Sequence, residues 1–155
     1  MNKGNLKEIE NYKILDQIQH KHSYSNDFLK INHTIMLVID PKTGEIIDAN
    51  AGACLFYQYN YDHIIKLKIS DINLCTIEEI DIDMKLAVGE EKNCFYFKHR
   101  LANGDIRDVE VHSGPITQKN RQLLYSIIID ITDSKKIEEE MIKKTMNWKV
   151  KLKLI

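Results

Sequence analysis

The chain changes its hydrophobic period near residue 34. Upstream, apolar residues recur every three or four positions among Lys, Glu, Asn and Gln, which predicts an amphipathic helix over residues 5–20. Downstream, residues 35–39 and 46–49 are short apolar runs rich in β-formers. Between them stands Asp40-Pro41-Lys42-Thr43-Gly44, in which proline fixes φ and glycine closes a turn. The two runs therefore predict a β-hairpin.

Residues 50–91 carry helical rather than alternating patterns. Asn50 can cap a helix over 51–58, and Asp62 and Asp71 can each cap a further short helix. The longest helix of this stretch is expected after the capping box Thr76-x-x-Glu79, with three apolar residues along one face: Ile80, Met84 and Val88.

Strand patterns return at residues 93–100, 105–113 and 123–131, and the first two strands meet at Ala102-Asn103-Gly104. A two-residue Asn-Gly turn would set Phe97 opposite Glu110. A three-residue loop with Gly104 in the left-handed conformation pairs Phe97 with Val109 instead, which sorts apolar from polar residues. We predict this second register, whose inward-facing residues are Phe95, Phe97, His99, Val109 and Val111.

The third strand, 123–131, is apolar on both faces. An antiparallel strand with one face in water should alternate, so we expect another element to cover its back. The chain then continues into a charged segment from Ser134, which predicts an exposed helix.

Composition and charge narrow the functional classes. With 43% hydrophobic and 29% charged residues the chain is an ordinary globular domain. Its six glycines are too widely spaced for a phosphate-binding loop, which argues against dinucleotide enzymes, kinases and P-loop ATPases. Residues 71–91 hold seven acids against Lys85 alone, interpreted as a solvated helix face, and residues 141–155 hold five lysines and no acid. We interpret that tail as a solvated helix and predict no nucleic-acid partner.

Neither a metal site nor membrane insertion is predicted. Cys54, Cys75 and Cys94 lie far apart with no C-x-x-C motif, and we expect reduced, buried side chains. His20 and His22 would not share a helix face, and His112 is expected to face solvent. The start of the chain has no secretion signal and no apolar run is long enough to span a bilayer, so the expected location is the cytoplasm.

Several short motifs, in this order and spacing, resemble a PAS domain of the bacterial sensory-box kind. They are Asp40-Pro41-x-x-Gly44, Asp48-Ala49-Asn50, Phe97-Lys98-x-Arg100-x-x-Asn103-Gly104, Val109-x-Val111 and Asp130-Ile131-Thr132-Asp133. The resemblance implies an α+β fold, with a five-stranded antiparallel sheet cupped by short helices on one face. It divides the chain into an N-terminal flanking helix (1–24), a PAS sensor domain (25–133) and a C-terminal signalling helix (134–155).

The resemblance also implies which residues act. Signals would pass through Asp130, Ile131 and Thr132 to an output domain of the diguanylate cyclase or histidine kinase type, which this sequence does not contain. The register and the resemblance together predict a mostly apolar lining for the cup, suited to a small apolar or aromatic ligand. Its residues are Leu37, Ile39, Cys54, Ile80, Met84, Phe95, Phe97, His99, Val109, Val111, Ser126 and Ile128.

Haem and a covalent flavin adduct are not expected, whereas flavin bound without an adduct remains an open alternative. Haem-binding relatives use a histidine on the long helix before strand 93–100, where this chain has only Met84 as a conceivable ligand. Light-sensing relatives form a flavin adduct with a cysteine where this chain has Ser70-Asp71-Ile72-Asn73. His99 should point inward beside Arg107, with a hydrogen-bonded position at the rim as its simplest interpretation.

Two functions remain, and neither is enzymatic, because no catalytic grouping of side chains stands out. The first is a sensory module that binds a ligand in the cup. The second is a purely structural dimerisation domain with a filled core. Both include a homodimer, because period two places five large apolar residues on the outer face of the sheet, where the N-terminal helix or a partner would cover them. These residues are Met36, Val38, Tyr125, Ile127 and Ile129.

Overall fold

A computed structural model describes residues 34–155 of the chain. The helix expected over 5–20 and its proposed covering role lie outside these residues. The described elements follow in this order: β1 (Ile35–Ile39), β2 (Ile46–Ala49), α3 (Ala51–Tyr57), α4 (Tyr61–Ile64), α5 (Ile69–Ile72), α6 (Ile77–Val88), β3 (Cys94–Arg100), β4 (Ile106–Gln118), β5 (Arg121–Asp130) and α7 (Thr132–Lys153).

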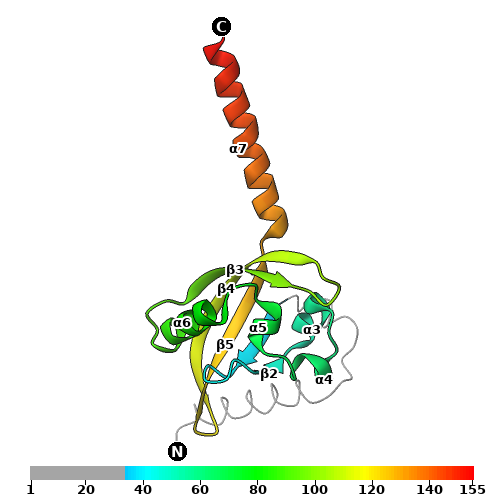
Figure 1. Cartoon of the computed structure of the whole chain (residues 1–155), viewed down its shortest axis with the longest axis vertical. Coiled ribbons are helices and arrows are strands. Elements are labelled where there is room, and N and C mark those ends of the chain that lie inside the picture. Colours follow the sequence, from blue (N-terminus) through cyan, green and yellow to red (C-terminus); the bar gives the residue numbers. More distant parts are fainter. Residues whose placement is uncertain (1–33) are drawn as a thin grey trace, which may run out of the picture. The chain divides into compact units, whose positions relative to one another are not determined.

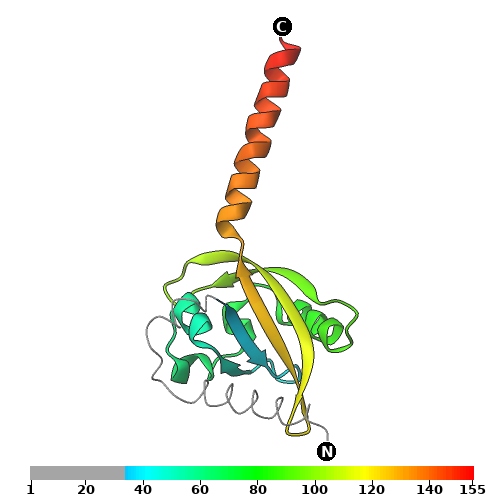
Figure 2. The ribbon, with the colours of Figure 1, turned by 180° about the vertical axis from the view of Figure 1, so that it is seen from behind.

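The strands form one antiparallel sheet in the order β2-β1-β5-β4-β3, which confirms the predicted fold class (Figure 1). Because β5 lies between β1 and β4, the last strand of the domain is the central one. Seen from behind, β1, β4 and β5 lie in front of the helices, so α3 to α6 cover one face of the sheet (Figure 2). The hydrophobic core lies between that face and the helices.

The predicted register of the β3–β4 hairpin is confirmed. Phe95 pairs with Val111 and Phe97 with Val109, and Gly104 has a φ of 91° in the connecting loop. On the opposite face, Lys98 donates to Asp108 across the strands at 2.8 Å. The first hairpin is confirmed as well, with Gly44 at a φ of 74° closing its turn.

The second strand was predicted too short, because β4 continues to Gln118 and turns directly into β5. Lys119 and Asn120 both have positive φ, 48° and 59°, as a two-residue type I′ hairpin requires. Pro115 is tolerated inside β4 because the neighbouring strand β3 begins only at Cys94, which pairs with His112, so no β3 residue lies opposite Pro115.

Helix caps are partly as predicted. Asn50 accepts from the Ala53 N–H at the start of α3, and the Thr76–Glu79 capping box begins α6. The other two predicted caps are wrong. Asn60, and not Asp62, caps α4. Asp71 lies inside α5 and accepts from the Lys68 N–H at 2.8 Å, so it stabilises that helix from its third position.

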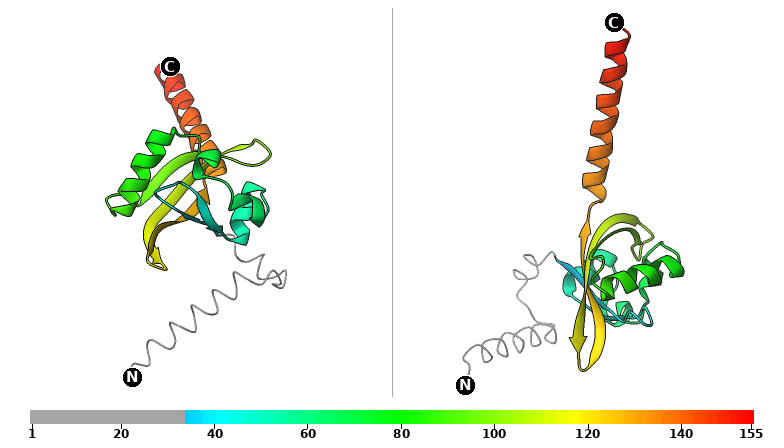
Figure 3. Two further views of the ribbon diagram at one scale, coloured as in Figure 1. Left: turned by 60° about the horizontal axis from the view of Figure 1, so that its bottom comes forward. Right: turned by 90° about the vertical axis from the view of Figure 1, so that its left-hand side faces the viewer.

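Helix α7 begins at Thr132, two residues before the predicted start, and projects away from the sheet beyond the end of β5 (Figure 3). Its apolar side chains include Ile137, Met141 and Trp148, all more than half exposed. Within residues 34–155, no helix is both long enough and apolar enough to cross a membrane.

Candidate functional site

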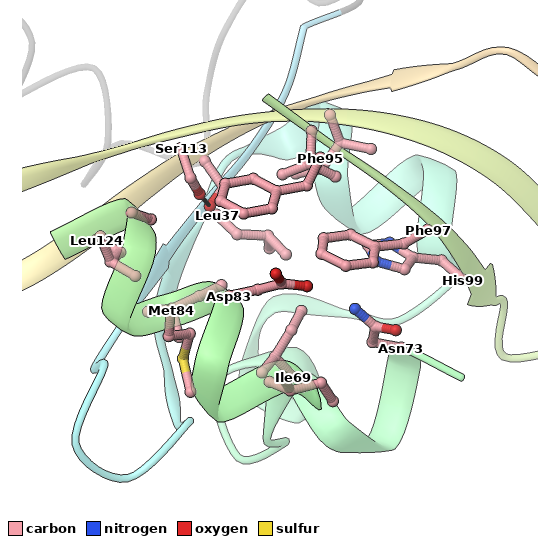
Figure 4. A pocket seen from close by; sticks show the side chains of 16 residues that line it. Leu37, Ile69, Asn73, Asp83, Met84, Phe95, Phe97, His99, Ser113 and Leu124 are labelled. Atoms are coloured by element: carbon pink, nitrogen blue, oxygen red, sulfur yellow. Dashed lines mark hydrogen bonds between the residues drawn. The ribbon is translucent and has the colours of Figure 1, made fainter. Parts of the chain in front are cut away.

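A cavity of about 50 Å³ lies between the inner face of the sheet and helices α5 and α6 (Figure 4). Strands β1, β3, β4 and β5 form its roof, and the two helices form its floor. Most of its wall is apolar, and a few polar side chains reach it from different elements. Such a hollow, with few convergent polar groups, is the usual form of a small-molecule site.

Ten of the twelve residues predicted for the cup lie on this wall: Leu37, Ile39, Ile80, Met84, Phe95, Phe97, His99, Val111, Ser126 and Ile128. The other two do not. Cys54 is on α3 and half-buried beside the core, and Val109 is fully buried within it. Both contribute to the packing of the core instead.

Sequence reasoning missed six residues of the wall: Ile69, Asn73, Asp83, Ala87, Ser113 and Leu124. Asp83 was assigned to a solvated helix face, and that prediction is wrong, since its carboxylate points into the cavity from α6 (Figure 4). Its position three residues after Ile80, on the buried side of α6, is the signal that could have found it.

His99 is buried rather than at the rim. It is 2% exposed, and its Nδ1 lies 2.8 Å from the hydroxyl of Tyr57, which is also fully buried. Burial lowers the pKa of His99 to about 4, so the ring is neutral near pH 7. The rim prediction failed because its hydrogen-bonding partner comes from α3, far away in sequence.

Asp130 joins the end of β5 to the start of α7. Its Oδ2 accepts from Nη2 of Arg107 at 2.7 Å, and its Oδ1 accepts from the Thr132 hydroxyl at 2.6 Å. Burial raises the pKa of this carboxyl, but the bonds from Arg107 and Thr132 outweigh it and hold the pKa below its ordinary value. Thr132 in turn accepts from the Asp108 N–H at 2.9 Å. The three predicted relay residues therefore lie at a junction that anchors α7 to β4.

The outer face of β1 and β5 carries the apolar residues predicted for it. Met36 pairs with Ile127 and Val38 with Tyr125 across the two strands. These four are half-buried, and Ile129 is 46% exposed. The alternation of β5 therefore sends one apolar set into the cup and another to the back of the sheet.

Comparison with known proteins identifies the fold family. Residues 33–133 match the PAS domain family. The chain belongs to the PAS family. PAS domains are sensory domains of signalling proteins. Diguanylate cyclase DgcM of Escherichia coli (strain K12) is 33% identical over 124 residues, which cover 78% of this chain and 30% of that protein. The chain thus spans less than a third of the length of this relative.

Solved PAS structures show the same fold at lower identity. The PAS domain of an HTR-like protein from Haloarcula marismortui has a TM-score of 0.61 at 19% identity, covering 84% of this chain and all of that one. A PAS domain from Desulfitobacterium hafniense has a TM-score of 0.60 at 17% identity, covering 68% and 99%.

One group of side chains in this PAS domain has the donor types that zinc takes. Cys94, Glu110 and His112 lie on the outer face of β3 and β4, with ligand atoms within 4.8 Å of one another. Sequence analysis predicted no metal site and expected His112 in solvent. The ring is only partly exposed, and its Nε2 lies 2.6 Å from Glu110 Oε1. The hydrogen bond between His112 and Glu110 already gives two of these three side chains a partner.

Replacing His99 with glutamine should reduce the loss of stability in acid. The pKa of His99 is lowered by burial, so the unfolded chain binds more protons between about pH 6.5 and pH 4. Stability is therefore lost as pH falls through this window. From pH 7.5 to 5 the wild type should lose about 2 kcal/mol more than His99→Gln, measured by urea unfolding. The nearby charges, Asp83 and the Arg107–Asp130 pair, are the same in both proteins. Equal losses would contradict a buried neutral ring.

Replacing Thr132 with valine should loosen the junction without changing side-chain shape. The Asp108 N–H then loses its acceptor and Asp130 loses a donor, at a cost of about 1–2 kcal/mol. Hydrogen exchange at the Asp108 and Lys135 amides should accelerate about tenfold or more. Thr117→Val, at the exposed end of β4, is the control and should leave these amides unchanged. Unchanged exchange in Thr132→Val would show that α7 is held by other contacts.

Proposed function

We propose that this PAS domain senses a small ligand in its cup and relays binding to an output domain through α7. The observation that carries the proposal is the apolar cavity with its few convergent polar groups, lined by ten residues chosen from sequence alone. The proposal gives the domain no catalysis of its own and the cytoplasm as its compartment.

The path from cavity to junction is short. His99, on the cavity wall, is the direct cross-strand partner of Arg107. Arg107 holds Asp130, and Asp130 holds Thr132 at the first residue of α7. A ligand that displaces β3 relative to β4 would therefore change the geometry of this ion pair. Two discrete arrangements of the pair would give α7 two positions.

A second function is favoured by the size of the cavity. A volume of about 50 Å³ is a third of the roughly 150 Å³ that admits benzene in an engineered cavity. A purely structural dimerisation domain with a nearly filled core would have such a cavity. Ligand binding then requires either a compact ligand or movement of the wall, where Met84 is the most flexible side chain.

The output domain proposed is of the diguanylate cyclase type, with a histidine kinase as the alternative. The similarity to DgcM supports the first, and it spans the sensory part rather than the whole of that protein. A PAS domain from a two-component sensor histidine kinase has a TM-score of 0.55 at 16% identity, which supports the fold alone.

The proposed assembly is a homodimer through the outer face of β1 and β5. Its support is the apolar set on that face, which a monomer rarely leaves uncovered. Helix α7 adds to it, because Ile137, Met141 and Trp148 recur at spacings of four and seven residues along a mostly charged helix. Two parallel α7 helices could pair through these residues.

Ligand identification tests the proposal most directly. Protein purified from its native host should carry a small molecule visible by native mass spectrometry or as absorbance above that of the polypeptide. Protein that is empty and remains indifferent to its host's metabolite extract would favour the structural alternative.

Replacing Ser126 with leucine should expel that molecule. The larger side chain fills a cavity of about 50 Å³, and it breaks the hydrogen bond between the Ser126 and Ser113 hydroxyls. Ser126→Ala breaks the same bond and adds no volume, so it is the matched control. Native mass spectrometry should find the ligand on Ser126→Ala at close to the wild-type level and at less than about a tenth of it on Ser126→Leu. Equal retention would place the ligand elsewhere.

Replacing Ile129 with glutamate should weaken the proposed homodimer. Ile129 is 46% exposed on the outer face, so a charge there costs little in the free subunit and much in a buried interface. Sedimentation analysis should show the dissociation constant rising at least about tenfold. Ile106→Glu is the control, since Ile106 is 51% exposed at the far hairpin. A dimer unaffected by Ile129→Glu would exclude this face.

A further inference from the structure

The buried polar atom His99 Nε2 has no hydrogen-bonding partner among the described residues. His99 is 2% exposed and lies on the cavity wall, so this nitrogen is closed off from bulk water. Buried nitrogens without a partner are rare, because they lose hydration and gain nothing in return. An atom of this kind beside a cavity indicates a ligand that forms a hydrogen bond with it.

Tyr57 decides which hydrogen-bonding role that nitrogen has. The Tyr57 hydroxyl is fully buried, and Nδ1 of His99 is its only partner in the described part of the chain. If Nδ1 carried the ring hydrogen, the hydroxyl would accept it and its own hydrogen would have no acceptor. The pair is satisfied only when the hydroxyl donates to Nδ1. The ring hydrogen is then on Nε2, which is a donor.

A second donor and one carboxylate reach the same cavity. Asn73 forms a β-bridge with His99, and its Oδ1 already accepts from the Cys75 N–H, which leaves its amide NH2 for the cavity. Asp83 points in from α6 (Figure 4). No lysine or arginine is among the residues described on this wall. The mostly apolar wall disfavours a charged ligand, and the carboxylate with no cation beside it opposes an anion in particular. The two donors favour a ligand that carries a hydrogen-bond acceptor.

We propose that the cup takes a compact, neutral ligand whose apolar body carries a hydrogen-bond acceptor, a carbonyl oxygen or aromatic ring nitrogen, which accepts from the Nε2–H of His99. This inference depends on the proposed function, since it names the ligand class of the same cavity. The cavity of about 50 Å³ holds a few atoms as it stands, and a small ring enters only when the wall moves, with Met84 as its most flexible side chain. The Tyr57–His99 pair thus makes His99 a donor with a fixed direction.

The test uses three rings of nearly equal size with the whole chain. Pyridine offers a hydrogen-bond acceptor, pyrrole offers a donor, and benzene offers neither. Binding is measured by NMR titration at about pH 8, where pyridine is uncharged, following the resonances of residues on the cavity wall. Pyridine should bind about fivefold tighter than benzene, and pyrrole no tighter than benzene. Nitrogen-15 spectra of the ring should show the Nε2–H tautomer in the free protein.

Variants of His99 distinguish a hydrogen bond to the ligand from a simple fit of the ligand's shape. His99→Leu should abolish the preference for pyridine over benzene while keeping an apolar wall. Because this change leaves the Tyr57 hydroxyl unpaired, the double variant Tyr57→Phe/His99→Leu removes both polar groups together and guards against misfolding. His112→Leu, on the outer face, is the control and should keep the wild-type preference.

The outcomes distinguish this inference from the function it depends on. Equal binding of pyridine and benzene, preference for pyrrole, or an Nδ1–H tautomer would overturn the inference while leaving a ligand-binding cup. A preference that survives in both His99 variants would also overturn it. Failure of all three rings to shift any resonance of the cavity wall would overturn this inference, and the proposed function would fall with it only if protein from the native host is also empty.

Discussion

The central position of β5 is the constraint on which the rest of the structure depends. A strand with neighbours on both sides and apolar residues on both faces must be covered on both faces, or the domain leaves hydrophobic surface in water. Helices α3 to α6 cover one face, and α5 and α6 enclose the cavity against it. The other face carries the apolar set proposed for a dimer. The same strand runs directly into α7, so the most constrained strand is also the one that leads out of the domain.

Local and alternating features were predictable from the sequence. The β3–β4 register followed from face sorting alone, because a shift by one residue in either direction would have placed an acid, Asp108 or Glu110, opposite Phe97. The Asn50 cap and the Thr76–Glu79 box were visible because a cap involves residues within one turn. The β4–β5 turn was missed because Lys119-Asn120 is not among the usual turn pairs. Its positive φ values are imposed by the register on either side.

The cavity was predictable in its apolar part and not in its polar part. Alternation along β3 and β4 predicted four of the ten wall residues: Phe95, Phe97, His99 and Val111. The resemblance to the PAS family implied the other six. The roles of His99 and Asn73 depend on contacts between distant segments, about which a period in the sequence carries no information. Asp83 could have been found from its helical spacing to Ile80. Tyr57 is 42 residues from His99, and their hydrogen bond turns a residue expected at the rim into a buried donor.

In the proposed relay, the polar groups around β4 connect the mostly apolar cup to the polar junction. Arg107 faces the same side of the sheet as His99 and is held by Asp130, whereas Asp108, the next residue, accepts from Lys98 of β3 and Lys135 of α7 on the outer side. Adjacent residues of β4 therefore connect α7 to both faces of the sheet. A sideways movement of β3 would alter both sets of bonds together, because Lys98 and His99 belong to that strand. A movement of α7 would act on the cup through the same bonds, since coupling between two sites is reciprocal.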